Sequence, residues 1–311
     1  MVLALIAFSA AALAQSPPAA PAPSPAIQAA LTKVDAGDPG PLVALADGGD
    51  AEAQYYAGVL FIFGRGTIQK DAVRGCAYEQ KASAGRADAM YLVGMCHQSG
   101  ASGSQDNAKA EAAFTRAGEM GFPKAKCALG KMLMADSQRA ERGLALCQEA
   151  ATAGDADAQV AAGDAYFNGA AAKRDYSAAR KWYAMAAQQN NTHAARRLGE
   201  MYASGDGGPK DTKKAMELWT AAEKAGDPLV AILVADQLFS DLTGGRKPGP
   251  GTYAFKGSVP VSDLAVVEEW YQLAQDRDPR PDVKERAKYA LSILSKLQAA
   301  AQASAVKSSK R

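Results

Sequence analysis

Histidine is nearly absent from this chain, which has only His97 and His193 among its 311 residues. The two lie in different parts of the sequence, and we do not expect them to bind one metal ion together. The motifs HExxH, CxxC and GxSxG are missing as well, and with them the usual signatures of zinc proteases, dithiol redox sites and serine hydrolases. We therefore expect no catalytic residue, no metal site and no cofactor.

The chain also lacks an excess of charge of either sign, because 35 basic residues face 33 acidic ones. No stretch in the body of the chain concentrates Lys and Arg, so nucleic acid is not an expected partner. Aromatic residues make up only 7% of the chain, whereas alanine is abundant. This composition favours helices that pack through small side chains.

Long apolar runs are missing except at the start, where residues 1–14 read MVLALIAFSAAALA. This run is too short to span a bilayer as a helix. It ends in the small-x-small sequence Ala12-Leu13-Ala14, which is typical of a signal peptide cleavage site, although no Lys or Arg precedes it. A buried N-terminal helix is the alternative. We expect a periplasmic or secreted protein with no membrane span after signal cleavage.

Two further segments look irregular. Residues 15–27 are rich in Pro and Ala, and proline removes amide donors, so this segment predicts an extended linker. Residues 299–311 lack large apolar anchors and end in basic residues, and they predict a disordered basic tail.

An internal period organises the middle of the chain. One series of glycines has spacings of 36, 36, 33 and 36 residues: Gly58, Gly94, Gly130, Gly163 and Gly199. A second series, which begins at Gly49 and ends at Gly226, has the same single deletion of three residues. Two series that share one deletion indicate true repeats, each of which needs its neighbours to bury its apolar face.

Each repeat predicts two helices, A and B. Helix A carries the first-series glycine and ends at another glycine, such as Gly205, which can adopt the positive φ of a helix end. Helix B begins after an aspartate that can accept hydrogen bonds from the free amides of the first turn. The predicted capping residues are Asp71, Asp106, Asp175 and Asp211. Eight residues after three of them stands an aromatic that we expect to pack on the glycine of helix A: Phe114, Tyr183 and Trp219.

The best unit, AARRLGEMYASGDGGPKDTKKAMELWTAAEKAG, resembles the Sel-one-like repeat. This family is related to tetratricopeptide repeats but has a longer loop between its two helices. The resemblance implies an all-α fold, a right-handed α/α superhelical solenoid of about six helix-turn-helix repeats. It also implies a role as an adaptor or scaffold, in some relatives a regulatory one, that binds a protein or peptide without catalysis.

The resemblance divides the chain into segments. It predicts N-terminal capping helices over 28–50 and five repeats over 51–227. A degenerate sixth repeat would cover 228–280, with Trp270 as its aromatic and an inserted loop at 242–261, and a capping helix would follow at 281–298. The inserted loop is a second candidate for a recognition element.

The chain has four cysteines, Cys76, Cys96, Cys127 and Cys147. In two antiparallel helices, residues equally distant from the turn face each other. The midpoint of Cys76 and Cys96 falls beside the turn at Gly85, and that of Cys127 and Cys147 falls in the shortened loop of the third repeat. For an exported protein we therefore predict the disulfides Cys76–Cys96 and Cys127–Cys147. Four buried free thiols are the alternative.

In related solenoids helix A lines the concave face, at fixed offsets from the conserved glycine that fall on one side of the helix. The offsets predict a partner-binding face made of Tyr55, Val59, Ile62, Phe63, Tyr91, Met95, Gln98, Asp164, Phe167, Arg196 and Glu200. Its first half is apolar and typical of a surface that binds protein or peptide. We expect a monomer or weak dimer.

Two alternatives to this interpretation stay open. Tyr55 and Phe63 could instead pack under the N-terminal linker. Exported relatives also suggest an enzyme that binds cell-wall fragments or penicillin, although the sequence offers no nucleophile with a neighbouring base.

Overall fold

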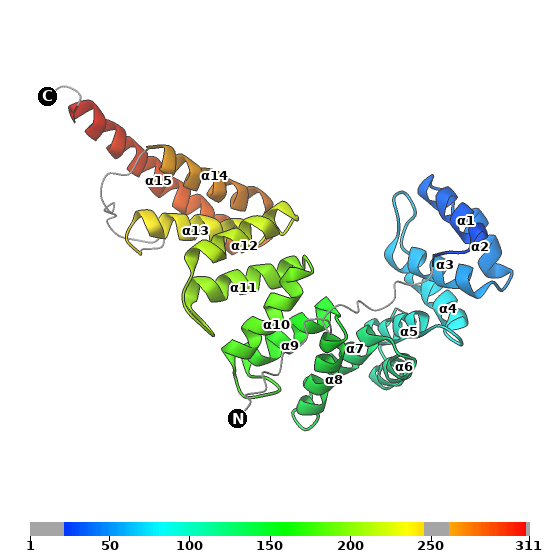
Figure 1. The fold of residues 1–311 in the computed structure, drawn as a ribbon. Helices are drawn as coiled ribbons and strands as arrows, with labels where there is room; N and C mark the ends of the chain where they lie inside the picture. Colours follow the sequence, from blue (N-terminus) through cyan, green and yellow to red (C-terminus); the bar gives the residue numbers. More distant parts are fainter. Residues whose placement is uncertain (1–21, 102, 246–260, 309–311) are drawn as a thin grey trace, which may run out of the picture. The chain divides into compact units, whose positions relative to one another are not determined.

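The computed structural model describes residues 22–101, 103–245 and 261–308, and these form fifteen α-helices without a β-strand (Figure 1). The chain divides into two compact units, residues 1–174 and 175–311. The predicted signal peptide lies outside the described residues, and so does most of the predicted loop 242–261. No helix in the described part of the chain is long and apolar enough to cross a membrane.

The first unit contains nine helices that follow one another as helical hairpins. Their bounds are α1 Pro25–Asp35, α2 Gly40–Asp47, α3 Ala51–Phe63, α4 Ala72–Ala82, α5 Ala87–Ser99, α6 Asn107–Glu119, α7 Pro123–Met134, α8 Ala140–Thr152 and α9 Ala156–Asn168. Helices α1 and α2 pack on α3 through a core that includes Ile27, Leu42 and Leu60. These helices cap the first repeat, and α1 begins at Pro25, inside the segment predicted as linker.

The second unit contains the helices α10 Tyr176–Gln188, α11 Thr192–Ser204, α12 Thr212–Lys224, α13 Ala231–Leu242, α14 Val261–Arg277 and α15 Pro281–Ser308. Its last three helices share a core that includes Phe239, Leu264 and Leu294. Helix α15 does not end at 298, as predicted, but continues to Ser308. Its last ten residues are rich in alanine, the residue with the highest helix propensity, which explains why they extend the helix.

The aspartates predicted to cap helix B do so at α4, α6, α10 and α12. Each accepts a hydrogen bond from the amide three residues on, at 2.9–3.0 Å in the pairs Asp71–Arg74, Asp106–Lys109, Asp175–Ala178 and Asp211–Lys214. Gly205 has a φ of 90° and ends α11. The Gly-rich stretch from Gly205 to Asp211 is therefore a link between two helices that carries the end signal of one and the start signal of the next.

The conserved glycines of helix A allow close contact with helix B. A Cβ added at Gly94 would lie 2.6 Å from Cδ1 of Phe114, and one at Gly199 would lie 2.7 Å from Cδ1 of Trp219. A Cβ at Gly130 would collide with the backbone carbonyl oxygen of Gly143 and would lie 2.9 Å from the Sγ of Cys147. At Gly94 and Gly199 the bare backbone thus provides the space that a helix-B aromatic fills.

The sixth repeat corrects one prediction from the sequence. Tyr271 rather than Trp270 is the buried helix-B aromatic, because Tyr271 stands eight residues after Asp263, as in the other repeats. Its hydroxyl donates a hydrogen bond of 2.9 Å to Oδ1 of the buried Asp236. Trp270 is only partly buried and packs at the margin of the same core.

Candidate binding face on helices α3 and α5

Three of the residues predicted for the binding face meet around one cavity of about 180 Å³ in the first unit. Ile62 comes from the end of α3, and Met95 and Gln98 come from α5. Cys76, Leu92, Cys96, Ser99 and Ala101 complete the lining. The wall is mostly apolar, and the volume is close to that of engineered apolar cavities of about 150 Å³ that hold benzene. The cavity can therefore accept one apolar side chain or a small apolar molecule.

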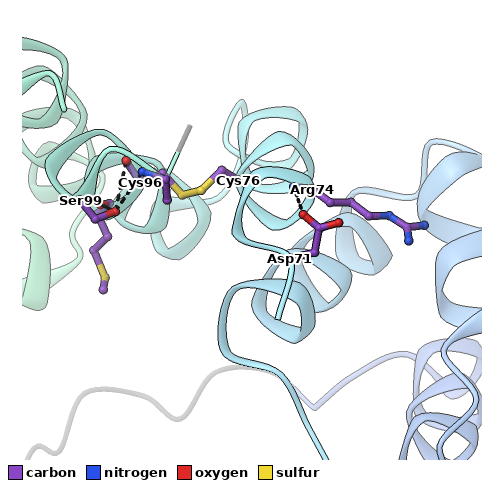
Figure 2. Close-up of a disulfide and its surroundings, with 7 residues drawn as sticks. Asp71, Arg74, Cys76, Cys96 and Ser99 are labelled. Carbon is purple, nitrogen blue, oxygen red and sulfur yellow. Dashed lines mark hydrogen bonds between the residues drawn. A yellow bond between two sulfur atoms is a disulfide. The ribbon is translucent and has the colours of Figure 1, made fainter. Parts of the chain in front are cut away.

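Helix α4 closes this cavity through a close helix contact and a covalent link. A Cβ at Gly75 would lie 2.7 Å from the backbone nitrogen of Ile62, so only glycine lets α4 approach α3 at this point. One residue later, Cys76 forms a disulfide with Cys96 of α5, with 6.0 Å between the two Cα atoms (Figure 2). The predicted pair Cys127–Cys147 is also bonded and links α7 to α8.

Figure 2 places Cys96 and Ser99 on α5, opposite Cys76. The Ser99 hydroxyl donates to the carbonyl of Met95 at 2.9 Å, so its hydrogen is used within the helix. The side chain of Gln98 is exposed. Gln98 is therefore the cavity residue best placed to exchange hydrogen bonds with a bound molecule.

The residues three positions before the conserved glycine make contacts between successive repeats. The Arg86 guanidinium lies 4.2 Å from the ring centroid of Tyr55, and the rings of Tyr91 and Phe122 lie 5.3 Å apart. Each of these tyrosines contacts the residue 31 positions later, at the start of the next helix A. Both tyrosines are half-buried. Part of their surface therefore stabilises the stack.

The second unit repeats this arrangement with charges. Nε of Arg196 lies 3.2 Å from Asp227, again 31 residues later, and its Nη1 lies 3.5 Å from Glu200. Arg197 also pairs with Glu200, at 3.2 Å. The predicted face residues Arg196 and Glu200 thus belong to an intramolecular ion-pair network in the second unit.

The remaining predicted residues lie elsewhere in the first unit. Val59 and Phe63 line a smaller cavity of about 90 Å³ together with Leu31 and Val34 of helix α1. Phe63 is nevertheless 48% exposed. Most of the predicted linker lies outside the described residues. Asp164 and Phe167 on α9 are half-buried. Of the eleven predicted residues, Ile62, Met95 and Gln98 line the larger cavity.

Sequence reasoning missed a buried carboxyl group beside this face. Glu79 of α4 is completely buried, and neither of its carboxyl oxygens has a hydrogen-bond partner. Burial raises its pKa to about 9, and the negative charge of Asp88 adds to the effect. The signal was present, because Glu79 stands eight residues after the cap Asp71, where other repeats carry an aromatic.

Nearby Tyr55 has a pKa raised to about 12, first by burial and then by the carboxylates of Asp88 and Glu79. Its hydroxyl is therefore neutral at physiological pH. Among the described residues, no group of three or more His, Cys, Asp or Glu side chains is placed to hold a metal ion.

Comparison with protein families accounts for this architecture. The Sel1 repeat matches four times, at residues 51–85, 87–122, 156–191 and 192–227. The chain belongs to the Sel1 repeat family. The segment between the second and third matches contains the repeat with the shortened loop, and its helices α7 and α8 nevertheless form a hairpin joined by the second disulfide. Sel1 repeat proteins are generally non-catalytic scaffolds for protein interactions.

Several solved structures are similar to this chain. A Sel1 repeat protein from Oxalobacter formigenes is 24% identical over 80% of this chain and 68% of its own, with a TM-score of 0.54. A protective antigen of uropathogenic Escherichia coli strains with an SLR fold is 22% identical, over 81% of this chain and 58% of its own, with a TM-score of 0.47. An immunity protein from Pseudomonas aeruginosa is 20% identical, over 75% of this chain and 83% of its own, with a TM-score of 0.46.

Comparison with curated proteins gave no significant match. The similarity to the Oxalobacter protein supports the repeat solenoid fold. The enzyme alternative raised by exported relatives receives no support from these comparisons.

Proposed function

We propose that this Sel1 repeat protein is a non-catalytic adaptor of the bacterial envelope that binds a protein or peptide through the α3–α5 face. The cavity bordered by Ile62, Met95 and Gln98 would receive one apolar side chain of the partner. The observation that carries the proposal is the meeting of these three helix-A residues around one apolar cavity of side-chain size.

The mechanism is the display of a rigid pocket. The disulfide Cys76–Cys96 and the close contact at Gly75 hold α4 against both α3 and α5. A wall that is already ordered loses little conformational entropy when a partner binds, which increases affinity. An apolar anchor in the cavity, with the exposed Gln98 at its edge, follows the common arrangement of an apolar core with a polar rim.

The location outside the cytoplasm is part of the proposal. It is supported by the two disulfides, since such bonds persist mainly in oxidising compartments. The sequence of residues 1–14, which is typical of a signal peptide, supports the same location.

A test of the proposal blocks the cavity from its exposed edge. Gln98→Trp adds a large side chain there without removing a buried group, and Gln80→Trp makes the same change at an exposed position of α4 that does not line the cavity. Wild type and both variants would be compared in quantitative crosslinking capture from native envelopes. We expect Gln98→Trp to capture at least about tenfold less of a specific partner than wild type, whereas Gln80→Trp captures the same amount. A tenfold loss of affinity corresponds to about 1.4 kcal/mol. Equal capture by all three folded proteins would show that the cavity does not contact the partner.

A further inference from the structure

Glu79 is the one residue in the described part of the first unit that combines complete burial with two unpartnered carboxyl oxygens. Its side chain points at helix α3, because a Cβ added at Gly58 would lie 2.6 Å from its Cδ and 2.7 Å from its Cγ. The carboxyl group thus lies in the close contact between α3 and α4, the place where Phe114 and Trp219 pack in other repeats.

The position of Glu79 decides its preferred protonation state. A buried carboxylate without hydrogen bonds or a close cation loses its hydration without replacement, at a cost of several kcal/mol. The neutral acid costs much less, because it carries no net charge into the helix contact. The packing therefore favours the protonated form.

The groups that face Glu79 do not offset this preference. From α3 the neighbour is Tyr55, and from the start of α5 the neighbours are Arg86 and Asp88. Nη2 of Arg86 is only 2.7 Å from Asp88, and its guanidinium covers the ring of Tyr55. Since Asp88 already neutralises this cation, Arg86 lowers the pKa of Glu79 less than burial and Asp88 raise it.

We propose that Glu79 is a built-in proton switch, neutral in the closed α3–α4–α5 junction and ionised when this junction opens. Glu79 lies one turn after Cys76 on α4, and Gly58 lies one turn before Ile62 on α3. The carboxyl group is thus adjacent to the walls of the cavity. The switch itself does not depend on whether that cavity binds a partner.

The direction of the pH effect follows from proton linkage. In the open junction Glu79 has an ordinary pKa near 4.5, whereas in the closed junction its pKa is about 9. The closed form therefore binds the proton more tightly. Its stabilisation by Glu79 is complete below about pH 4.5 and declines as the pH rises towards 9. Within this window the opening equilibrium should increase by up to tenfold per pH unit, because opening releases one proton.

The experiment measures amide hydrogen exchange of α3–α5 between pH 5.5 and 8.5 under conditions where exchange reports the opening equilibrium. After correction for intrinsic exchange, we expect wild-type opening to increase by up to tenfold per pH unit. Glu79→Gln keeps the shape but cannot ionise, and should be independent of pH. The matched control Glu119→Gln, at an exposed position of α6, should behave as wild type.

Two results would overturn the proposal: opening in the wild type that does not change with pH, or an equal pH slope in wild type and Glu79→Gln. If the glutamine variant does not fold, an NMR titration of the Glu79 Cδ resonance in the wild type decides instead. A titration midpoint well above pH 7 supports the switch. A midpoint near the ordinary glutamate value of 4.5 refutes it.

Discussion

Replacement of Gly199 by alanine tests whether the conserved glycine exists to accommodate Trp219. The new Cβ would contact Nε1 of the indole and would lie 2.7 Å from Cδ1 and 2.9 Å from Cε2. Carbon atoms in contact prefer about 3.5–4.0 Å, so the ring has to move by about 1 Å. Trp219 is only 3% exposed, and its Nε1 donates a hydrogen bond of 3.1 Å to the carbonyl of Arg196. The ring has little freedom to move without loss of packing or of this bond.

The magnitude combines three contributions. Overpacking of a core costs about 1–3 kcal/mol. Loss of the indole hydrogen bond costs about 1 kcal/mol. Alanine gains about 1 kcal/mol over glycine from helix propensity. Gly199→Ala should therefore lower the free energy of unfolding of the second unit by about 2 kcal/mol, although propensity alone predicts a gain.

The assay is urea unfolding followed by tryptophan fluorescence. All three tryptophans lie in residues 175–311, so this signal reports on the second unit. Gly85→Ala is the control for handling and expression, because a Cβ at this position meets no atom within 4 Å. The fluorescence-detected unfolding transition of this variant should match that of the wild type. In the background Trp219→Leu, which removes the ring, Gly199→Ala should no longer destabilise. A loss of 2 kcal/mol that persists in this background, or no loss in the wild-type background, would refute the packing explanation.

Three further changes probe other contacts. Gly130→Ala should destabilise the first unit by about 3 kcal/mol or more, because the new Cβ would collide with the carbonyl oxygen of Gly143 and backbone cannot rotate away as a side chain can. Thermal unfolding followed by circular dichroism measures this loss of stability. Replacement of both Cys127 and Cys147 by alanine should lower the free energy of unfolding by about 3 kcal/mol, given a sequence separation of 20 residues. Urea unfolding at matched pH, with and without reductant, separates the loss of the disulfide from the loss of side-chain packing. Tyr271→Phe should cost about 1–2 kcal/mol because it deprives a buried aspartate of a hydrogen bond, and an unchanged midpoint of fluorescence-detected unfolding would contradict it.

The repeat architecture could be predicted because each of its signals is local. An aspartate that caps a helix needs only the amide three residues later, and Asp211 does this whatever packs around it. A glycine that ends a helix needs only a positive φ, as at Gly205. The cysteine pairing also followed from distance along the chain, since two helices joined by a tight turn place equidistant residues together. Such short-range rules repeat every unit, so they appear as a period in the sequence.

The lining of the cavity could be predicted only in part, because the surroundings of each helix-A residue depend on contacts between repeats. Helical periodicity grouped Ile62, Met95 and Gln98 among the candidate residues, and these three line one cavity. The same periodicity could not indicate that Tyr55 is covered by Arg86, since that contact joins residues 31 positions apart in different repeats. Which residues of a face remain available is decided by such neighbours.

The sequence by itself therefore determined the repeat, the residues that cap its helices and the cysteine pairs, all through interactions within a helix or across a single turn. The tertiary structure alone decided the electrostatic state of Glu79 and the location of the cavity. The physical reason for the state of Glu79 is desolvation. A carboxyl group has an ordinary pKa until surrounding helices exclude water from it, and only packing determines where that happens.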